Sequence, residues 1–191
     1  MEQIVRRRPG RPGEAPLRCA VTGHRPQKCA YRFNESDPRC VDFKARLYAY
    51  IEYLIGQGYG HFLSGGALGM DMYAAEAVLA LKSRYPWIRL ELVIPHPGQE
   101  NAWPEALAAR YRSLVAQADI LTYTASRYSP FCMSRRNRYL VQHADLLLAA
   151  FDGQPGGTRS TVLYAERQHV PVIVIDPAPT ENTAQPVDNY A

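Results

Sequence analysis

The chain has 191 residues, of which 47% are hydrophobic, and its formal net charge is +4. That length suits one well-buried domain, and the composition is ordinary for a globular protein. No apolar run approaches the ~18 residues that a membrane span needs, and the arginine-rich start lacks the apolar segment of a secretory signal. We therefore expect a cytoplasmic protein with no membrane partner.

The four cysteines are Cys19, Cys29, Cys40 and Cys132, and they form no C-x-x-C pair. In the cytoplasm such cysteines are expected to be free thiols. A metal site made by His24 with Cys29 and Cys40 stays open, but zinc ligands usually come in closer pairs. We predict that the protein holds no metal and requires no cofactor.

Both ends of the chain are rich in proline and polar residues and lack hydrophobic periodicity. We therefore predict a disordered basic tail over residues 1–16, one domain over residues 17–176 and a second disordered tail over residues 177–191. The first tail has four arginines against two glutamates, while the second has two acids and no base, so the domain itself keeps the charge of +4. That charge suits an anionic small molecule and does not require nucleic acid.

Between the tails, short apolar runs alternate with helical patterns. The predicted strands cover residues 17–22, 62–64, 90–94, 120–123, 146–151 and 172–175. The predicted helices cover residues 38–57, 69–84, 104–117, 133–143 and 158–168. Several strands are apolar throughout, which favours a parallel sheet covered on both faces. The fold class is therefore α/β, a doubly wound, mostly parallel and Rossmann-like sheet, whose ligands bind beyond the carboxyl ends of the strands.

The loop after the first strand reads TGHRP, residues 22–26. Gly23 allows a sharp turn, and Arg25 offers a planar guanidinium that can pair with a phosphate or a carboxylate. His24 is either a ligand contact or a structural imidazole. This loop is a candidate part of a binding site.

The loop after the second strand, SGGALGMD, is typical of a phosphate cradle. Gly65 and Gly66 can adopt positive φ and let the backbone approach a ligand, and the N–H groups that open the helix near Gly69 have no intrahelical acceptor. The spacing fits neither a Walker A loop nor a dinucleotide fingerprint, and a plain strand-to-helix turn is the alternative. We expect Asp71 to accept a hydrogen bond from a hydroxyl or from nearby backbone rather than to meet the anion.

A third loop leads into a helix through three arginines, Arg135, Arg136 and Arg138, for which Ser134 is the expected N-cap. Three cations at the positive end of a helix dipole are unfavourable unless an anion is near. Removal of Arg136 should then leave the stability unchanged or raise it. The alternative interpretation is a solvated charge cluster.

The fourth loop runs from Asp152 to Thr158 and contains Gly156 and Gly157. It resembles the second loop, because a glycine-rich turn again joins a buried strand to a helix. The first turn of this helix also offers hydroxyl side chains. Two such turns at one sheet edge suggest a single phosphorylated ligand that is held from two sides.

In chain order, the segments TGHRP, SGGALGMD, Gln99–Trp103, RRN and GGT resemble the YpsA family. That family is a branch of the SLOG superfamily, which also groups the DprA/Smf DNA-processing proteins and the LOG phosphoribohydrolases. The resemblance covers roughly residues 18–176 and implies a Rossmann-like fold that binds a nucleotide or a nucleotide derivative such as an ADP-ribose-like molecule. It implies these binding residues: Gly23, His24, Arg25, Ser64, Gly65, Gly66, Gly69, Asp71, Arg136, Asn137, Gly156, Gly157 and Thr158.

The chain departs from the LOG motif P-G-G-x-G-T-x-x-E at its acidic position, which falls on Leu163 or Tyr164. Glu166 lies about one turn further on, so a shifted acid stays open. We therefore assign no catalytic residue, because no other pair of acids marks a glycosidic acid/base couple.

Three functions follow from these observations. The leading one is a sensor or adaptor that binds a nucleotide derivative. The second is an N-glycosidic hydrolase that acts on a nucleotide or nucleotide sugar. The third is DNA binding, with weak contact through the basic tail, whose residues 8–12 contain the Gly-Arg-Pro core of minor-groove peptides but lack the arginine usually found before it. A homodimer is left open.

Overall fold

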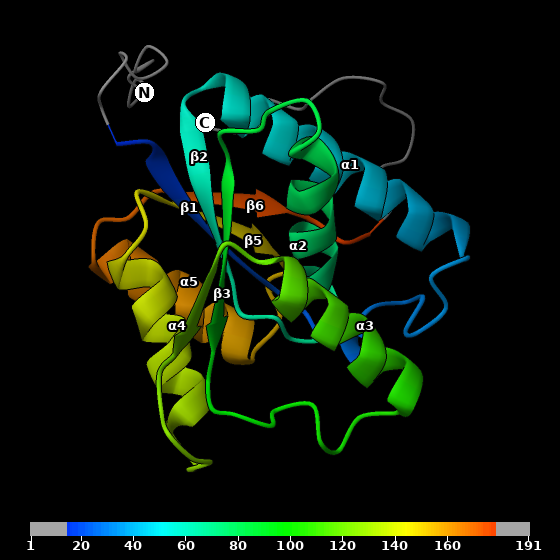
Figure 1. The fold of residues 1–191 in the computed structure, drawn as a ribbon. Helices are drawn as coiled ribbons and strands as arrows, with labels where there is room; N and C mark the ends of the chain where they lie inside the picture. The colour runs from blue at the N-terminus through cyan, green and yellow to red at the C-terminus, as the bar shows by residue number, and fades with distance from the viewer. Residues whose placement is uncertain (1–14, 179–191) are drawn as a thin grey trace.

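A sheet of six parallel strands forms the centre of the computed structural model, which describes residues 15–178 (Figure 1). The strands are β1 (Leu17–Gly23), β2 (Tyr59–Ser64), β3 (Arg89–Ile94), β4 (Ile120–Tyr123), β5 (Leu146–Ala150) and β6 (Val172–Ile175). Their spatial order is β4-β3-β2-β1-β5-β6, with every neighbouring pair parallel. The predicted α/β class and Rossmann-like sheet are confirmed.

Five α-helices join the strands: α1 (Pro38–Gly56), α2 (Met70–Leu81), α3 (Glu105–Gln117), α4 (Cys132–Gln142) and α5 (Gly157–Arg167). Figure 1 places α1, α2 and α3 on one face of the sheet and α4 and α5 on the other. Each face has its own apolar core, and alternate residues of β1 divide between them: Val21 faces the α1–α3 side, whereas Ala20 faces the α4–α5 side. The sheet is therefore covered on both sides, as its apolar strands predict.

The strand order reverses beside β1, because the chain adds β2, β3 and β4 on one side of it and then crosses to add β5 and β6 on the other. All strands point the same way, so the loops after β1, β2 and β5 leave the sheet at one edge. In doubly wound sheets this reversal opens the crevice that holds a ligand. The third candidate loop follows β4 and leaves at the same edge, so the topology agrees with the expectation that the candidate loops lie beyond the carboxyl ends of the strands.

Most predicted element boundaries agree with the structure within a few residues. The second strand starts at Tyr59 rather than Phe62, because the pairing of β2 with β1 extends back past Gly60. A correction concerns the start of α4, where Phe131 rather than Ser134 is the N-cap and the Ser134 hydroxyl donates to the Phe131 carbonyl. Helix α4 therefore starts earlier, and Arg136 and Arg138 lie beyond its first turn.

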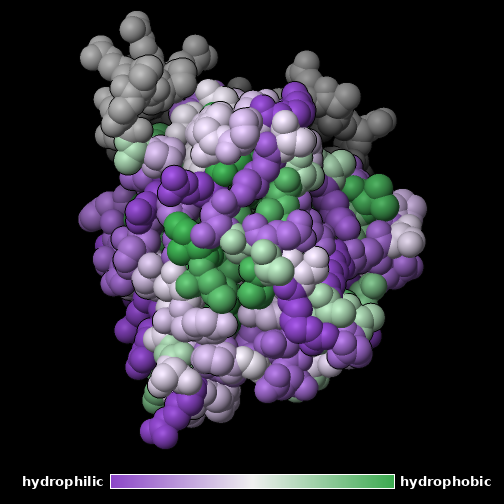
Figure 2. Space-filling model, in the orientation of Figure 1, coloured by the Kyte–Doolittle hydropathy of each residue, from purple (hydrophilic) through white to green (hydrophobic). Residues whose placement is uncertain are grey.

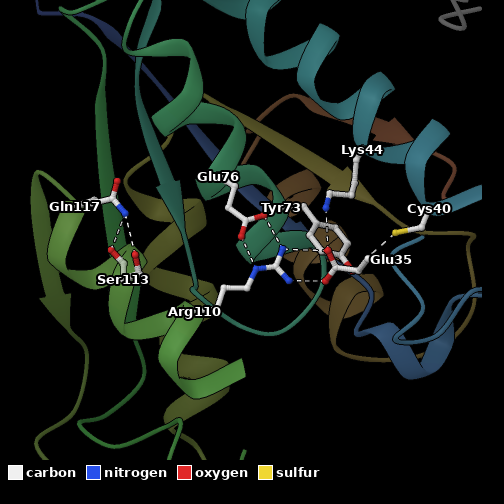
Figure 3. Close-up of polar contacts among 8 residues, drawn as sticks. All are labelled: Glu35, Cys40, Lys44, Tyr73, Glu76, Arg110, Ser113 and Gln117. Carbon is white, nitrogen blue, oxygen red and sulfur yellow. Dashed lines mark hydrogen bonds and ion pairs between the residues drawn. The ribbon is translucent and has the colours of Figure 1, made fainter. Parts of the chain in front are cut away.

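The segment between β1 and α1, residues 24–37, is held in place by a charged cluster (Figure 3). Glu35 of this segment pairs with Arg110 of α3 and with Lys44 of α1, whose Nζ lies 2.8 Å from a Glu35 carboxylate oxygen. Arg110 also pairs with Glu76 of α2, and both cations lie over the ring of Tyr73. One cluster thus ties three helices to the segment that follows β1. This segment carries Arg25 and the short 3-10 turn η1 (Pro26–Lys28).

The edge strand β4 leaves large side chains exposed. Figure 2 shows a hydrophobic patch near the middle of the face viewed. Leu121 and Tyr123 are 39% and 47% exposed, respectively. Within residues 15–178, no helix is both long and apolar enough to span a membrane. The predicted tails lie almost wholly outside the described residues, so their disorder stays a prediction.

Candidate functional site

A cavity of about 170 Å³ opens where the strand order reverses, between the loops after β1 and β5. Helices α2 and α4 contribute its other walls. Its lining residues are Thr22, Gly23, His24, Arg25, Lys28, Ala67, Asp71, Met133, Arg136, Asn137, Gly157 and Thr158.

The structure brings most of the predicted binding residues to this cavity, from four elements far apart in the sequence. Those that line it are Gly23, His24, Arg25, Asp71, Arg136, Asn137, Gly157 and Thr158. The predicted residues outside the lining are Ser64, Gly65, Gly66, Gly69 and Gly156. Lys28 and Met133 line the cavity although sequence reasoning did not select them. The position of Lys28 only five residues after Gly23, on a loop at the ligand edge, is the signal that could have identified it.

The glycine-rich loop after β2 is filled by side chains of the protein itself. A Cβ atom on Gly65 would lie 1.1 Å from Nη1 of Arg136 and 2.5 Å from a carboxylate oxygen of Asp71. Nη1 of Arg136 donates to that carboxylate at 2.8 Å, and the Ala67 N–H donates to the same oxygen at 3.3 Å. The expectation that Asp71 accepts from neighbouring backbone is confirmed. The anion that this loop holds is thus the carboxylate of Asp71.

Arg136 is 5% exposed and its pairing with Asp71 is a buried ion pair. This finding corrects the expectation of three unneutralised arginines at the start of α4. Arg135 donates to the Thr124 carbonyl, and Arg138 lies over the ring of Tyr164. One atom of the pair remains unsatisfied, because the buried Nε of Arg136 has no partner within the described part of the chain.

Three further predicted positions shape the turn from behind the cavity. The Ser64 hydroxyl donates to the backbone carbonyl of Asp71 and accepts from the Gly66 N–H. Gly66 has φ +61°, and a Cβ there would lie 3.0 Å from Ile94 in the core. Gly69 has φ +89° and packs against the backbone of His24. Close backbone approach at Gly66 therefore serves the packing of the turn.

Trp103 and Gln99 also turn toward the protein. Trp103 packs edge to face on Tyr111 of α3, with ring centroids 5.4 Å apart. Gln99 is 9% exposed and donates to the Gly66 carbonyl at 3.3 Å. Through these contacts, the segment after β3 supports the glycine-rich turn that follows β2.

The start of α5 presents a different environment. Gly156 is the N-cap and has no side-chain capping bond, so the N–H groups of Gly157 and Thr158 have no intrahelical acceptor. A Cβ on Gly157 would meet nothing within 4 Å. Lys28 crosses from η1 to this loop, with its Nζ donating to the Pro155 carbonyl at 2.8 Å. An open helix N-terminus with an ammonium beside it is a typical anion site.

Arg25 adds a second cation to the same wall. It is partly buried, and its guanidinium donates no hydrogen bond to any residue between 15 and 178. Burial lowers the pKa of this guanidinium and the nearby Arg136 lowers it further, whereas Asp71 opposes both effects. An arginine stays protonated at neutral pH even so. Arg25 therefore brings to the cavity a positive charge that Asp71 attracts but that has no ion pair or hydrogen bond within residues 15–178.

His24 lies in the cavity wall between two polar partners and is 4% exposed. Its Nε2 lies 2.7 Å from Oδ1 of Asp152, and its Nδ1 lies 3.5 Å from Oγ1 of Thr158. The hydrogen bond from His24 lowers the pKa of Asp152, helped by the Gln154 N–H. His24 is therefore held by one acid and directed at the first turn of α5.

The residues that line the cavity include no unpaired acid that could assist cleavage of a glycosidic bond. Glu166 is exposed near the end of α5, about 12 Å along the helix axis from Thr158 at 1.5 Å per residue. Leu163, at the acidic position of the LOG motif, is 44% exposed. The shifted acid that the sequence left open is thus not at the cavity. The one lining acid, Asp71, is already paired with Arg136.

Comparison with known proteins gives one family and several relatives. Residues 19–177 match the model of the YpsA family, described as the YspA SLOG family. A UPF0398 protein from Bacillus pumilus is 32% identical over 141 residues, which are 73% of this chain and 75% of that protein. The uncharacterized SPbeta prophage-derived protein YoqJ from Bacillus subtilis is 30% identical over 70% of this chain and 86% of that protein.

Two solved structures of DNA processing protein A share the fold. The protein from Helicobacter pylori, studied for its single-stranded DNA binding mode, has a TM-score of 0.60 and 20% identity over 83% of this chain. The protein from Streptococcus pneumoniae has a TM-score of 0.60 and 16% identity over 86% of this chain. This chain spans 65% and 52% of those two proteins.

Proposed function

Because the chain belongs to the YpsA family of SLOG proteins, we propose that it binds a phosphorylated nucleotide derivative of the ADP-ribose type in the cavity beside β1. The observation that carries this proposal is the unpartnered guanidinium of Arg25, which faces the same cavity as the open N-terminus of α5. A partly buried cation without a partner costs free energy, and an anion removes that cost.

The charges of the cavity fit a phosphorylated ligand. Two acids at or beside the cavity have partners within the protein: Asp71 pairs with Arg136, and Asp152 accepts a hydrogen bond from His24. Among the described residues, Arg25 and Lys28 form no ion pair with a carboxylate, and both line the cavity together with the start of α5. A phosphate placed there would accept charge-assisted hydrogen bonds from backbone and side chains together.

The acids near the cavity favour a binding role over cleavage of a glycosidic bond. Asp71, which lines the cavity, is paired with Arg136, and Glu166 does not line it. Glycosidic cleavage usually needs a pair of available acids.

Calorimetric titration with ADP-ribose, and separately with adenosine, tests the proposal. ADP-ribose should bind, whereas adenosine, which has no phosphate, should bind at least about a hundredfold more weakly, because a hydrogen bond to a charged group contributes ~1.5–3 kcal/mol and several are lost. Equal affinity for the two ligands would contradict a phosphate site. Release of free adenine during the titration would move the protein to the N-glycosidic hydrolase alternative.

A second candidate, contact with single-stranded nucleic acid, is favoured by exposed aromatic side chains near α4. Tyr128 and Phe131 are 69% and 73% exposed, and the exposed Arg127 lies in the same loop. Aromatic side chains beside arginines form stacking platforms for unpaired bases. The fold shared with a single-stranded DNA-binding protein supports this candidate.

Fluorescence anisotropy with a labelled oligothymidine tests this candidate. Binding should weaken with salt and should drop when Tyr128 and Phe131 are both replaced by alanine, since each stacked base contributes ~1–3 kcal/mol. A parallel protein that lacks residues 1–16 separates this surface from the basic tail. If the tail deletion removes binding and the double alanine variant does not, the aromatic loop has no such role.

A further inference from the structure

His24 lies in the wall of the cavity with its two ring nitrogens in different environments. Nε2 lies 2.7 Å from the carboxylate of Asp152 and 3.4 Å from the Asp152 backbone nitrogen, and the shorter contact, to an acceptor, assigns the proton of the neutral ring to Nε2. Nδ1 is then the unprotonated nitrogen, and it lies 3.5 Å from Oγ1 of Thr158, which can donate to it. The acid thus fixes the tautomer that turns a lone pair toward the start of α5.

That lone pair faces the place where an anion would sit. Thr158 is in the first turn of α5, whose free N–H groups are the most favourable anion position of the cavity. A phosphate oxygen that approached Thr158 would meet the Nδ1 lone pair and be repelled by it. A proton on Nδ1 turns this repulsion into a charge-assisted hydrogen bond.

The surrounding charges also favour protonation of His24 more strongly when an anion is bound than when the cavity is empty. In the empty cavity, the cations of Arg25, Lys28 and Arg136 oppose a further positive charge on the ring, while Asp152 favours it and Asp71 is engaged by Arg136. A bound anion would neutralise the cations and remove that opposition. On its other side the ring borders a small apolar void, whose titratable neighbours are Cys29, Tyr31 and Tyr73.

We propose that His24 is the proton-exchanging group of this cavity, neutral when the cavity is empty and protonated when a phosphorylated ligand binds at the start of α5. The inference rests on the proposed ligand and adds its regulation: binding is coupled to uptake of a proton. Because an imidazole exchanges its proton between about pH 5 and 8, the affinity for the ligand then depends on pH in the physiological range. Stability of the complex is highest at the acid end of that range and falls as the pH rises.

Calorimetry of the full chain with ADP-ribose, in buffers of different ionisation enthalpy, measures the coupling directly. The diphosphate of ADP-ribose has no group that titrates near neutral pH, so any proton taken up is bound by the protein. We expect net proton uptake when ADP-ribose binds, with the affinity falling as the pH rises by at most about tenfold per pH unit, the limit for one coupled proton.

The variant Asp152→Asn separates a proton-exchanging role from a structural one. Asparagine keeps an acceptor oxygen for the Nε2 proton but removes the negative charge that stabilises the imidazolium, so proton uptake should fall while the ring stays in place. His24→Gln should abolish the uptake. His143→Gln is the matched control, because His143 caps α4 and does not line the cavity.

Each outcome decides the question. If ADP-ribose binds the wild-type protein with no proton uptake at any pH, or if His24→Gln leaves the uptake unchanged, the proposal is wrong and the ligand site stands. If ADP-ribose does not bind at all, the proposed function itself fails. Should His24→Gln not fold, nitrogen NMR of the wild-type His24 ring decides the matter, because Nδ1 must shift from an unprotonated to a protonated value when ADP-ribose is added.

Discussion

The two glycine-rich turns that follow β2 and β5 look alike in the sequence, but glycine serves opposite purposes in them. In the first turn, the space beside Gly65 is occupied by the guanidinium of Arg136, and the carboxylate of Asp71 takes the place of an anion. In the second turn, the space beside Gly157 is empty, and the start of α5 has no capping side chain. One turn makes room for side chains of the protein itself, and the other leaves open space beside the start of α5.

This difference shows how to interpret a glycine-rich turn at a ligand edge. Glycine at a strand-to-helix junction indicates that something approaches the backbone closely, but not what approaches it. Here the nearest heavy atom to a Cβ at Gly65 is 1.1 Å away, whereas Gly157 has none within 4 Å. Substitutions in the two turns should therefore damage different properties, the folded state in the first turn and ligand binding in the second.

The largest effect is expected for Gly65→Val. Its side chain would displace Arg136 from Asp71, so the cost combines a broken buried ion pair, about 3–5 kcal/mol, with ~1–3 kcal/mol of overpacking. That sum approaches the whole stability of a typical domain, and the protein should be largely unfolded in circular dichroism at room temperature. Gly56→Ala, at a position where a Cβ meets nothing within 4 Å, is the control that should fold normally.

Arg136→Ala comes next, with an expected loss of about 3–5 kcal/mol in the free energy of unfolding, because Asp71 is left buried and unpaired. The sequence predicted the contrary, that removing Arg136 would leave stability unchanged or raise it. Urea denaturation distinguishes the two. In a double-mutant cycle, Asp71→Ala and Arg136→Ala together should cost less than the sum of the single changes, and strict additivity would exclude the pair as a source of stability.

The fold could be predicted from the sequence because its signals are local. Apolar runs such as LLLAA mark buried parallel strands, and Asp37 followed by Pro38 opens α1 as a capping residue should. The start of β2 was missed because Gly60, a poor strand former, stands in it. Such errors move the predicted end of a strand by a few residues and leave the predicted topology correct.

The site was harder to predict because its pairings are not local. Asp71 and Arg136 are 65 positions apart, and His24 and Asp152 are 128 apart. Residue types and their order identified the candidates, but which cation is neutralised by which acid depends on three-dimensional contacts. From the sequence we expected Arg136 to have no partner within the protein. In the structure Arg136 pairs with Asp71, and it is Arg25 that forms no ion pair among the described residues.

Arg25→Gln should produce a smaller effect, and one confined to ligand binding. The side chain donates no hydrogen bond within residues 15–178, so its loss should change the free energy of unfolding by no more than about 0.5 kcal/mol. The affinity for ADP-ribose should fall about tenfold to a hundredfold, the equivalent of one hydrogen bond to a charged group at ~1.5–3 kcal/mol. Calorimetry measures the affinity, and a marked drop in melting temperature would instead make Arg25 a structural residue.

Gly157→Ala should have the smallest effect on the folded protein and gives the sharpest test of the second turn. Gly157 is the first residue of α5, and replacement of a helical glycine by alanine stabilises by about 0.4–1 kcal/mol where the backbone is compatible. The added methyl group enters space that is empty in the free protein but that a phosphate would occupy, so the melting temperature should rise slightly while the affinity for ADP-ribose falls. If the temperature rises and the affinity is unchanged, the start of α5 does not hold the phosphate. The two glycine turns would then differ only in packing, and the ligand would have to be sought around Arg25 alone.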